Sequence, residues 1–459
     1  MSQLKRETNE GQALQRQREL HEIDRAPQQA ANQQVNDFAM EPVPQQNRRS
    51  WWEITFVTSG FCMAVSGMFA GAALTAGLSL QNIMIAILVG NLVLALYGGF
   101  TGAIGAKTGV STTMLSRHAF GRHGSLVISI VWAITLIGWF SVQAGFFGQT
   151  VHSMYPNAGG ITDVPVAAAW GGVLMIFTAY IGFKGIRLLS SIAIPLLILL
   201  CIVGVVMSLN QVGGFSNLQA TITKPISLME GIVLVIGTFA VGAVIQPDIA
   251  RYAKSPKQSW TAIIVGMVIA NGFIVFAGAI TAIAMGTGDL PAVMLQLGLG
   301  IPALLILIAA QWTSNDSNLY SASLALSNIF RIAKSKLVLV VGIIATIIGA
   351  AGMADHFVNF LLAIGIAVPP VAGVLIADYF LVHKQRYQFG KGTKYASVVW
   401  PAFVAWAIGI VAGVFIDWGI ASLNSLIVAL LVHWGLYAIG KRFNIPVTSG
   451  SVEEKADGF

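Results

Sequence analysis

The chain has 459 residues, of which 56% are hydrophobic and only 10% are charged. This composition is too apolar for a soluble domain of that length and indicates a polytopic membrane protein. Lys and Arg outnumber Asp and Glu by 26 to 19. This excess needs no nucleic-acid partner, because basic residues orient membrane spans.

The first predicted element is a polar segment over residues 1–50. It is rich in Gln, Asn, Glu and Arg, so we expect a disordered cytoplasmic tail without a cleavable signal. The two cysteines, Cys62 and Cys201, both lie in apolar runs. We expect them to be small buried side chains rather than a disulfide or a metal site.

Twelve membrane spans follow the tail. A bilayer core about 30 Å thick requires about 20 apolar residues per helix. This criterion places the spans near 54–78, 83–105, 125–153, 166–185, 189–210, 228–249, 259–286, 300–329, 337–353, 357–380, 397–416 and 420–439. The predicted fold class is an all-α polytopic membrane protein with twelve transmembrane helices, ended by a second cytoplasmic tail at 441–459.

The basic residues near the span ends predict the orientation, because such residues stay preferentially in the cytoplasm. With a cytoplasmic N-terminus, Lys224 is the only basic residue between spans that falls outside. The cytoplasmic set is Lys107, Arg117, Arg122, Lys184, Arg187, Arg251, Lys254, Lys257, Arg331, Lys334, Lys336, Lys384, Arg386, Lys391 and Lys394. We therefore expect an inner or plasma membrane protein with both termini cytoplasmic.

Two of these spans contain glycines that would let a membrane helix break. The first span holds Gly60, Gly67 and Gly71, and the sixth holds Gly237 and Gly242. A repeat of spans one to five in spans six to ten would be inverted in the bilayer, and paired broken helices in such repeats mark transporter binding sites. The alternative that each set of glycines only allows close helix packing stays open.

The eighth span carries an unusual polar run, "QWTSNDSN", from Gln311 to Asn318. Hydrocarbon penalises polar atoms that have no partner, so we expect these groups to face a solute, an ion or neighbouring helices. Asp316 is a candidate proton carrier, although a capping or inter-helix role is favoured. Asp378, near a span end, is expected to be solvated or paired at the surface, and His433 is expected to pack.

Five segments resemble the nucleobase:cation symporters that include the bacterial cytosine permeases. The similarity spans residues 40 to 440. The segments are "EPVPQQNRR" (Glu41 to Arg49), "GNLVLALYGGFTGAIGAKTGVSTTMLSRHAFGRHGS" (Gly90 to Ser125), "IGWF" (Ile137 to Phe140), "WTSNDSNLY" (Trp312 to Tyr320) and "PPVAGVLIADYF" (Pro369 to Phe380).

This resemblance implies the inverted-repeat fold of the leucine transporter. The ten-helix core would cover 51–395, with repeats at 51–211 and 226–395, and helices eleven and twelve would cover 396–440. The implied function is cation-coupled import of a nucleobase or related small heterocycle, with Na⁺ as the coupling ion and no cofactor. A proton-coupled symporter for hydantoin, allantoin or another pyrimidine-like ring is the alternative.

The resemblance also implies a sodium site. Thr313 and Ser314 match the sodium-ligating hydroxyls of the family, with backbone oxygens from Ala310, Gly60 and Met63. Neutral oxygens suit a monovalent ion in the membrane, since burying carboxylates costs more than such an ion repays. The alternative is that both hydroxyls bond back to carbonyls one turn earlier.

The implied substrate site pairs aromatic faces with amides. Stacking holds a planar ring, and an amide can both donate and accept hydrogen bonds. Gln143 lies one turn after Trp139, hence on the same helix face, and Asn315 is the amide position that matches the family. The predicted substrate-binding residues are Trp139, Gln143, Thr238, Phe239, Asn315 and Asn318.

Two positions depart from the cytosine permeases, which have Gln and Ser where this chain has Leu136 and Val241. Cytosine is therefore in doubt, and a purine, a hydantoin or another pyrimidine-like ring is equally open. A membrane-embedded enzyme is disfavoured, because the seven histidines show neither HExxH spacing nor a cluster with carboxylates inside a span. A passive channel is disfavoured because no repeated pore-lining signature is present.

Overall fold

The computed structural model describes residues 38, 41–181, 183–330, 332–389, 393 and 395–443. The side chains of 181–191 and 328 lie outside this description. Most of both predicted tails, and the basic side chains of Lys184, Arg187, Arg331, Lys391 and Lys394, are therefore outside it too. Within the described part of the chain, the only β-pairing is an isolated bridge between Arg49 and Ala253.

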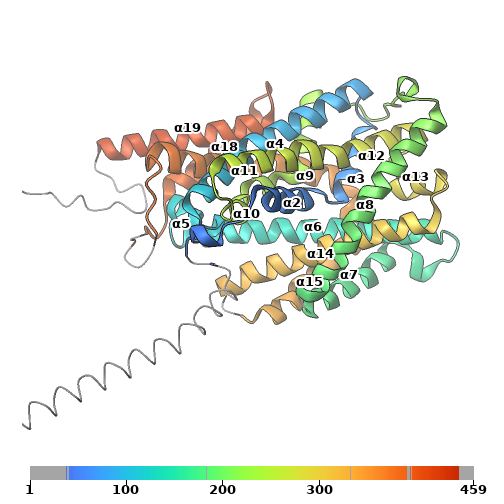
Figure 1. Cartoon of the computed structure of the whole chain (residues 1–459), viewed down its shortest axis with the longest axis horizontal. Helices are drawn as coiled ribbons and strands as arrows, with labels where there is room; N and C mark the ends of the chain where they lie inside the picture. The colour runs from blue at the N-terminus through green and yellow to red at the C-terminus, as the bar shows by residue number, and fades with distance from the viewer. Residues whose placement is uncertain are drawn as a thin grey trace, which may run out of the picture.

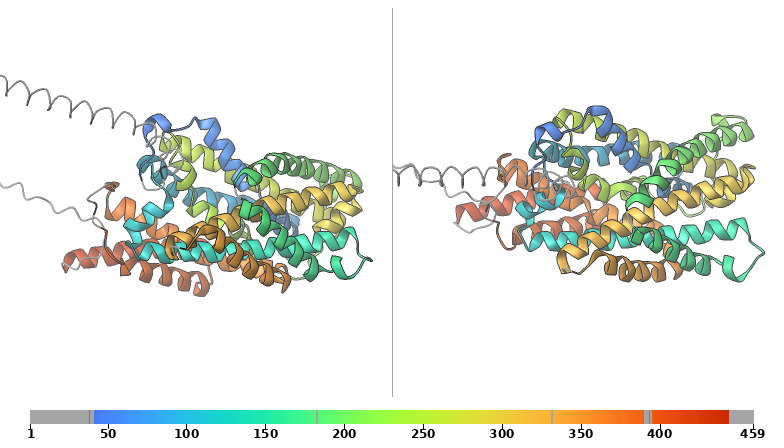
Figure 2. Two further views of the ribbon diagram at one scale, coloured as in Figure 1. Left: turned by 90° about the horizontal axis from the view of Figure 1, so that it is seen from below. Right: turned by 60° about the horizontal axis from the view of Figure 1, so that its bottom comes forward.

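The described residues form an elongated bundle of helices (Figure 1; two further views in Figure 2). The longer helices of the first half are α2 (Trp51–Cys62), α3 (Ser66–Leu74), α4 (Leu80–Thr108), α5 (Thr112–Phe120), α6 (Gly124–Met154), α7 (Val164–Ile181) and α8 (Phe183–Val212). Those of the second half are α9 (Leu228–Val244), α11 (Pro256–Ile264), α12 (Gly272–Met285), α14 (Gly300–Phe330), α15 (Lys334–Ala350), α16 (Phe357–Ala367), α17 (Pro369–Ile376), α18 (Trp400–Phe415) and α19 (Ala421–Arg442).

Short elements complete the chain. They are 3₁₀ turns η1 (Gln45–Asn47), η2 (Gly160–Thr162), η3 (Phe215–Asn217) and η5 (Met353–His356), π-helices η4 (Val265–Asn271) and η6 (Ala377–Val382), and helices α10 (Pro247–Ala250) and α13 (Leu290–Gln296).

A helix lies at each of the twelve predicted positions. Among the residues that the structure describes, seven helices are long and apolar enough to cross a membrane, and the bent pair α2–α3 would make eight. Apolar side chains on the outside of the bundle, such as Ile343 and Ile347 on α15 and Phe177 on α7, are exposed. A lipid environment accounts for this exposure, because hydrocarbon carries no penalty for apolar surface.

Serine caps start many of these helices. The Ser50 and Ser227 hydroxyls accept hydrogen bonds from the amides of Glu53 and Glu230, as in a capping box. The long helix α4 ends at Gly109, whose φ of 76° lies in the left-handed region that glycine adopts at low cost. These local signals place the helix ends where hydropathy alone leaves them several residues uncertain.

The helices pack in two groups. In one, α3 packs on α12, and α4 packs on α9 and α11; in the other, α6, α7, α14 and α15 pack together. The helix α8 contacts both groups through α12 and α14. The helices α18 and α19 pair with each other beside α17. The functional cavity lies where the two groups meet.

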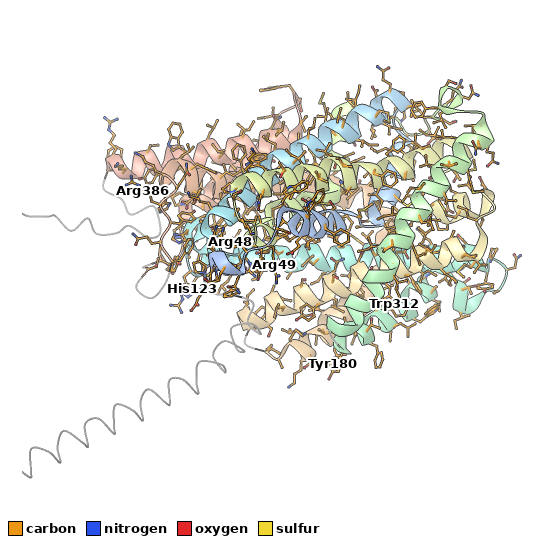
Figure 3. All side chains as sticks on the ribbon, viewed as in Figure 1. Arg48, Arg49, His123, Tyr180, Trp312 and Arg386 are labelled. Atoms are coloured by element: carbon orange, nitrogen blue, oxygen red, sulfur yellow. The ribbon has the colours of Figure 1, made fainter. Side chains whose placement is uncertain are left out.

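One end of the bundle is rich in basic side chains, and we call it the basic end. Arg48, Arg49, His123 and Arg386 lie there (Figure 3). The opposite end carries α13 (Figure 1), and we call it the far end. Both names describe the molecule alone and assign no side of a membrane.

Residues 41–50 differ from the predicted disordered tail. The amide of Val43 donates to Gly109 O (2.8 Å), and the amide of Arg49 donates to Tyr252 O (2.6 Å). The Arg48 guanidinium donates to Ala253 O (3.1 Å) and to Ala106 O. Because these carbonyls come from distant segments, the local composition gave no sign that this stretch would be held in place.

Candidate functional site

The first helix breaks in the middle of the bundle. The helices α2 and α3 meet at 56° across Met63–Val65, and Met63 has non-helical dihedrals of −87° and 69°. The amide of Ala64 donates to Cys62 O (3.1 Å) and that of Gly67 to Ala64 O (2.9 Å). The carbonyls of Gly60 and Met63 therefore lack the i+4 amide donors that a continuous helix supplies.

The second break lies in α9. Phe239 has dihedrals of −138° and 19° inside a segment that is otherwise helical. Gly237 lies beside it against α16, where an added Cβ would overlap the Leu361 carbonyl. Gly237 thus fits the close-packing alternative, and the non-helical dihedrals of the break lie two residues later, at Phe239.

The two breaks open onto one cavity of about 430 Å³, which we call the inner cavity. Its walls come from α2, α3, α6, α8, α9 and α14. Of the predicted residues, it brings together Gly60, Met63, Trp139, Gln143, Thr238, Phe239, Ala310, Thr313, Ser314 and Asn318. Phe56 and Val57, which follow Arg49 of the basic end by seven and eight residues, line it at 82% and 52% exposure.

One face of α14 supplies hydroxyls to the inner cavity. Thr313 and Ser314 both donate to Ala310 O at 3.0 Å, and Ser317 donates to Thr313 O at 3.1 Å. This is the back-bonding that the sequence left as the alternative to a sodium site. Since a hydroxyl keeps its lone pairs when it donates, the oxygens can still accept from a solute or bind a cation.

Two aromatic side chains contribute to the walls. Trp139 packs edge-on against Phe360 (5.2 Å between centroids). The Phe239 ring covers Gly242, where an added Cβ would overlap it, and it meets Phe61 edge-on at 5.0 Å. Both Trp139 and Phe239 are more than nine-tenths buried, so their positions are fixed by packing rather than by solvent.

The amide of Gln143 is the clearest unused polar group of the inner cavity. Its side chain is 2% exposed, and Oε1 has no hydrogen-bond partner among the described residues. A buried amide oxygen without a partner costs about 1 to 3 kcal/mol. A solute N–H placed in the cavity would remove that cost.

Thr238 is held by two asparagines that sequence reasoning missed. Its hydroxyl donates to Val235 O (2.6 Å) and accepts from Asn271 (3.2 Å), whose amide also donates to Asn91 (2.7 Å). Asn91 and Asn271 are at most 2% exposed. Both could have been found from the sequence, because each is an amide in the middle of an apolar span, where a polar group needs a partner.

Asn315 does not reach the inner cavity. Its amide donates to Phe140 O (3.1 Å) and contacts Met175 Sδ (3.2 Å), on α6 and α7. Successive residues of a helix are rotated by about 100°. Ala310, Thr313 and Ser317 lie on the face of α14 toward the cavity, and Asn315 therefore lies on a face toward the neighbouring helices. The structure corrects this prediction and leaves Asn318 as the amide of α14 on the cavity wall.

Asp316 also faces neighbouring helices. Its Oδ1 accepts from the Thr178 hydroxyl (2.7 Å), which in turn accepts from Trp312 Nε1 (2.8 Å). The side chain is 1% exposed, and Oδ2 has no partner in the described part of the chain. This arrangement ties α14 to α7, as the structural alternative predicts.

Apolar residues complete the walls. Leu136 and Val241, the two departures noted in the sequence, both line the inner cavity, as do Ile194 and Leu197 from α8. The α8 residues were missed because nothing distinguishes a cavity-facing Ile or Leu from a lipid-facing one in the sequence.

A family model described as a permease for cytosine/purines, uracil, thiamine and allantoin matches residues 42–440. The chain belongs to this permease family. It is 35% identical over 395 residues to the cytosine permease of Escherichia coli (strain K12), covering 86% of this chain and 92% of that protein. It is 24% identical over 450 residues to the hydantoin permease of Microbacterium maritypicum, covering 91% and 88%.

Solved structures agree on the fold of this permease. The structure described as "Inward facing conformation of Mhp1" matches with a TM-score of 0.78 at 22% identity, covering 89% of this chain and 94% of that one. The family resemblance predicted from the sequence is confirmed, and the chain is a membrane-spanning permease rather than an enzyme.

The permease has a second buried polar cluster, near the basic end. Asp378 is fully buried and contacts His383 Nδ1 (3.2 Å) and His433 Nε2 (3.2 Å), and it accepts from the Tyr387 hydroxyl. The expectation of a solvated or surface-paired Asp378 and of a merely packing His433 is wrong. The partner lies 55 residues away on α19, beyond what a sequence pattern can reveal.

Proposed function

We propose that this permease imports a nucleobase or a related planar heterocycle that carries N–H groups, coupled to Na⁺. One observation carries the proposal. The carbonyls freed at the α2–α3 break and the hydroxyls of α14 share one cavity with Trp139, Phe239 and the unpaired Gln143 amide.

The hydrogen-bonding balance of the inner cavity supports this solute class. The hydroxyl protons of Thr238, Thr313, Ser314 and Ser317 are all donated to backbone carbonyls. These groups therefore present lone pairs to the cavity, which is richer in acceptors than in donors. A ring with N–H groups and a cation both satisfy such a surface, whereas a purely accepting solute does not.

The ion and the solute would share structural elements. Gly60 is adjacent to Phe61, whose ring contacts Phe239. A cation held by the Gly60 and Met63 carbonyls would fix the broken segment, and with it the edge contact that positions the stacking ring. Such coupling is reciprocal, so the solute and Na⁺ should raise each other's affinity by the same factor.

The basic end indicates which side of the membrane the inner cavity faces. Basic residues near span ends favour the cytoplasm, so we assign the basic end to the cytoplasmic side of a plasma or inner membrane. The inner cavity reaches Phe56 and Val57 on that side. The neighbouring structure described as inward facing is consistent with a cavity that opens to the cytoplasm.

The helix packing supports a five-plus-five inverted repeat. The broken first span and its predicted counterpart α9 lie in one packing group, as do α4 and its counterpart α11–α12. The counterparts α6 and α14, and α7 and α15, lie in the other. A repeat related by a pseudo-two-fold axis would place counterparts together in this way.

A thermal-shift screen tests the proposal. Purified permease is heated with nucleobases, hydantoins or allantoin, each in sodium and in potassium. A ring present at a concentration of 100 times its Kd adds about 2.7 kcal/mol to the free energy of unfolding. The resulting rise in melting temperature should be larger in sodium than in potassium. The variant Gln143→Leu should show a smaller ring-dependent shift, and without a ring it should melt at the wild-type temperature. No shift with any ring would overturn the substrate class.

A proton-coupled permease for a similar ring is the second candidate, because the buried Asp316 keeps one carboxylate oxygen unpaired. Uptake into proteoliposomes separates the two. If uptake ignores sodium, follows a proton gradient and is lost in Asp316→Asn, the ion assignment to Thr313 and Ser314 is refuted.

A further inference from the structure

A second cavity of about 430 Å³ lies toward the far end, and we call it the outer cavity. Its walls come from the end of α3, the end of α6, the start of α7, the turn before α13, and the segment from η5 into α16. None of the predicted substrate or sodium residues lines it. Its volume equals that of the inner cavity, so it has room for a ring of similar size.

Aromatic rings separate the two cavities. Phe69 and Phe146 are stacked at 3.8 Å with an interplanar angle of 6°, and Phe146 meets Phe357 edge-on at 5.0 Å. All three line the outer cavity and are at most 7% exposed. Phe357 contacts Trp139 (6.2 Å) on the other side, where Trp139 lines the inner cavity. The floor of the outer cavity is thus an apolar aromatic partition.

The rim of the outer cavity is polar and rich in acceptors. Asp289 and Asp355 are exposed carboxylates on its wall. His152 Nδ1 faces Thr162 O (3.1 Å), so Nδ1 carries the proton and Nε2 is left as an acceptor when the ring is neutral. Gln149 and Asp355 make no side-chain hydrogen bond to any residue that the structure describes.

We propose that the outer cavity is a second binding site for the same class of planar N–H-bearing heterocycle, occupied from the far end while the aromatic partition is closed. The inference rests on the proposed function for the solute class. The aromatic floor would receive the apolar ring faces, and the amide of Gln149 would pair with a ring carbonyl. The carboxylates of Asp289 and Asp355 would accept hydrogen bonds from ring N–H groups.

Binding stoichiometry tests this site. A radiolabelled ring found in the thermal-shift screen is titrated by equilibrium dialysis against purified full-length permease in sodium. The wild type should saturate at two molecules per chain. Gln143→Leu should weaken the inner site and Gln149→Leu the outer site, each by about tenfold for one lost hydrogen-bonding amide. The double variant should show both sites weakened, each by about the same factor as in the single variants.

A charge-matched pair of variants sharpens the test. Asp355→Asn removes a rim carboxylate, whereas Asp163→Asn removes an exposed carboxylate just before α7 that does not line the outer cavity. Only Asp355→Asn should weaken the outer site and raise the KM for uptake from the far side. Asp289 is left unchanged, because its Oδ1 caps α13 through the Ala292 amide.

The outcomes separate the two proposals. Saturation at one molecule per chain, abolished by Gln143→Leu and indifferent to Gln149→Leu, overturns the outer site and leaves the proposed function standing. Two sites that ignore both Gln149→Leu and Asp355→Asn also overturn the assignment to this cavity. Failure of every ring to bind overturns both proposals.

Discussion

Replacing Gly242 by Ala should prevent the Phe239 ring from stacking on the solute without unfolding the permease. An added Cβ at 242 overlaps three atoms of the Phe239 ring and reaches no other residue so closely. The ring must therefore shift, and Phe61 limits its movement on one side at 5.0 Å. The Phe239 ring lines the inner cavity, so we expect it to shift into space that the solute would occupy.

The size of the effect follows from the stacking energy. Base–aromatic stacking is worth about 1 to 3 kcal/mol, which corresponds to a Kd raised by about 5- to 150-fold. Equilibrium dialysis of the identified ring measures it. Phe239→Leu, which removes the aromatic face directly, should give a loss of the same order.

Gly435→Ala is the matched control. No atom lies within 4 Å of an added Cβ at 435, so this variant should bind normally and gain up to about 1 kcal/mol of helix propensity. If Gly242→Ala keeps the wild-type Kd and melting temperature, Phe239 does not stack on the solute, and the assignment of the aromatic wall is wrong.

Three further predictions concern the ion site and the basic end. Replacing Thr313 by Val together with Ser314 by Ala should raise the half-saturating sodium concentration for uptake by about tenfold or more, since a bond to a charged group is worth about 1.5 to 3 kcal/mol. Asp378→Asn should lower stability by about 1 to 3 kcal/mol, measured as a lower melting temperature, because an amide NH2 replaces one of the two oxygens that accept from buried partners. Burial lowers the pKa of His118 to about 4. The His118 imidazole therefore binds a proton more tightly in the unfolded chain than in the folded one. Stability should thus fall by up to about 3 kcal/mol as pH drops from 6.5 to 4, and His118→Gln should flatten that slope in a melting-temperature series.

Each of these has a contradicting result. An unchanged sodium requirement in the Thr313/Ser314 double variant would place the ion elsewhere. A wild-type melting temperature for Asp378→Asn would mean that the carboxylate contributes nothing through its partners. A slope between pH 6.5 and 4 that persists in His118→Gln would assign the titration to other groups.

The sequence by itself determined the membrane class and the positions of the helices, because hydropathy and helix caps are local properties. The family resemblance identified the permease, and ten of the predicted site residues line the inner cavity. Local composition also predicted that the polar run of α14 needed partners, since any polar atom in hydrocarbon does.

Only the tertiary structure decided which partner each polar group has. The rotation of α14 about its axis is set by packing against α6 and α7, and it turned Asn315 away from the inner cavity while it left Ser317 and Asn318 on the wall. The pairing of Asp378 with His433, the anchoring of residues 41–50 and the aromatic floor of the outer cavity likewise join segments far apart in the chain. Such contacts depend on distances in space, which a one-dimensional pattern of residues does not contain.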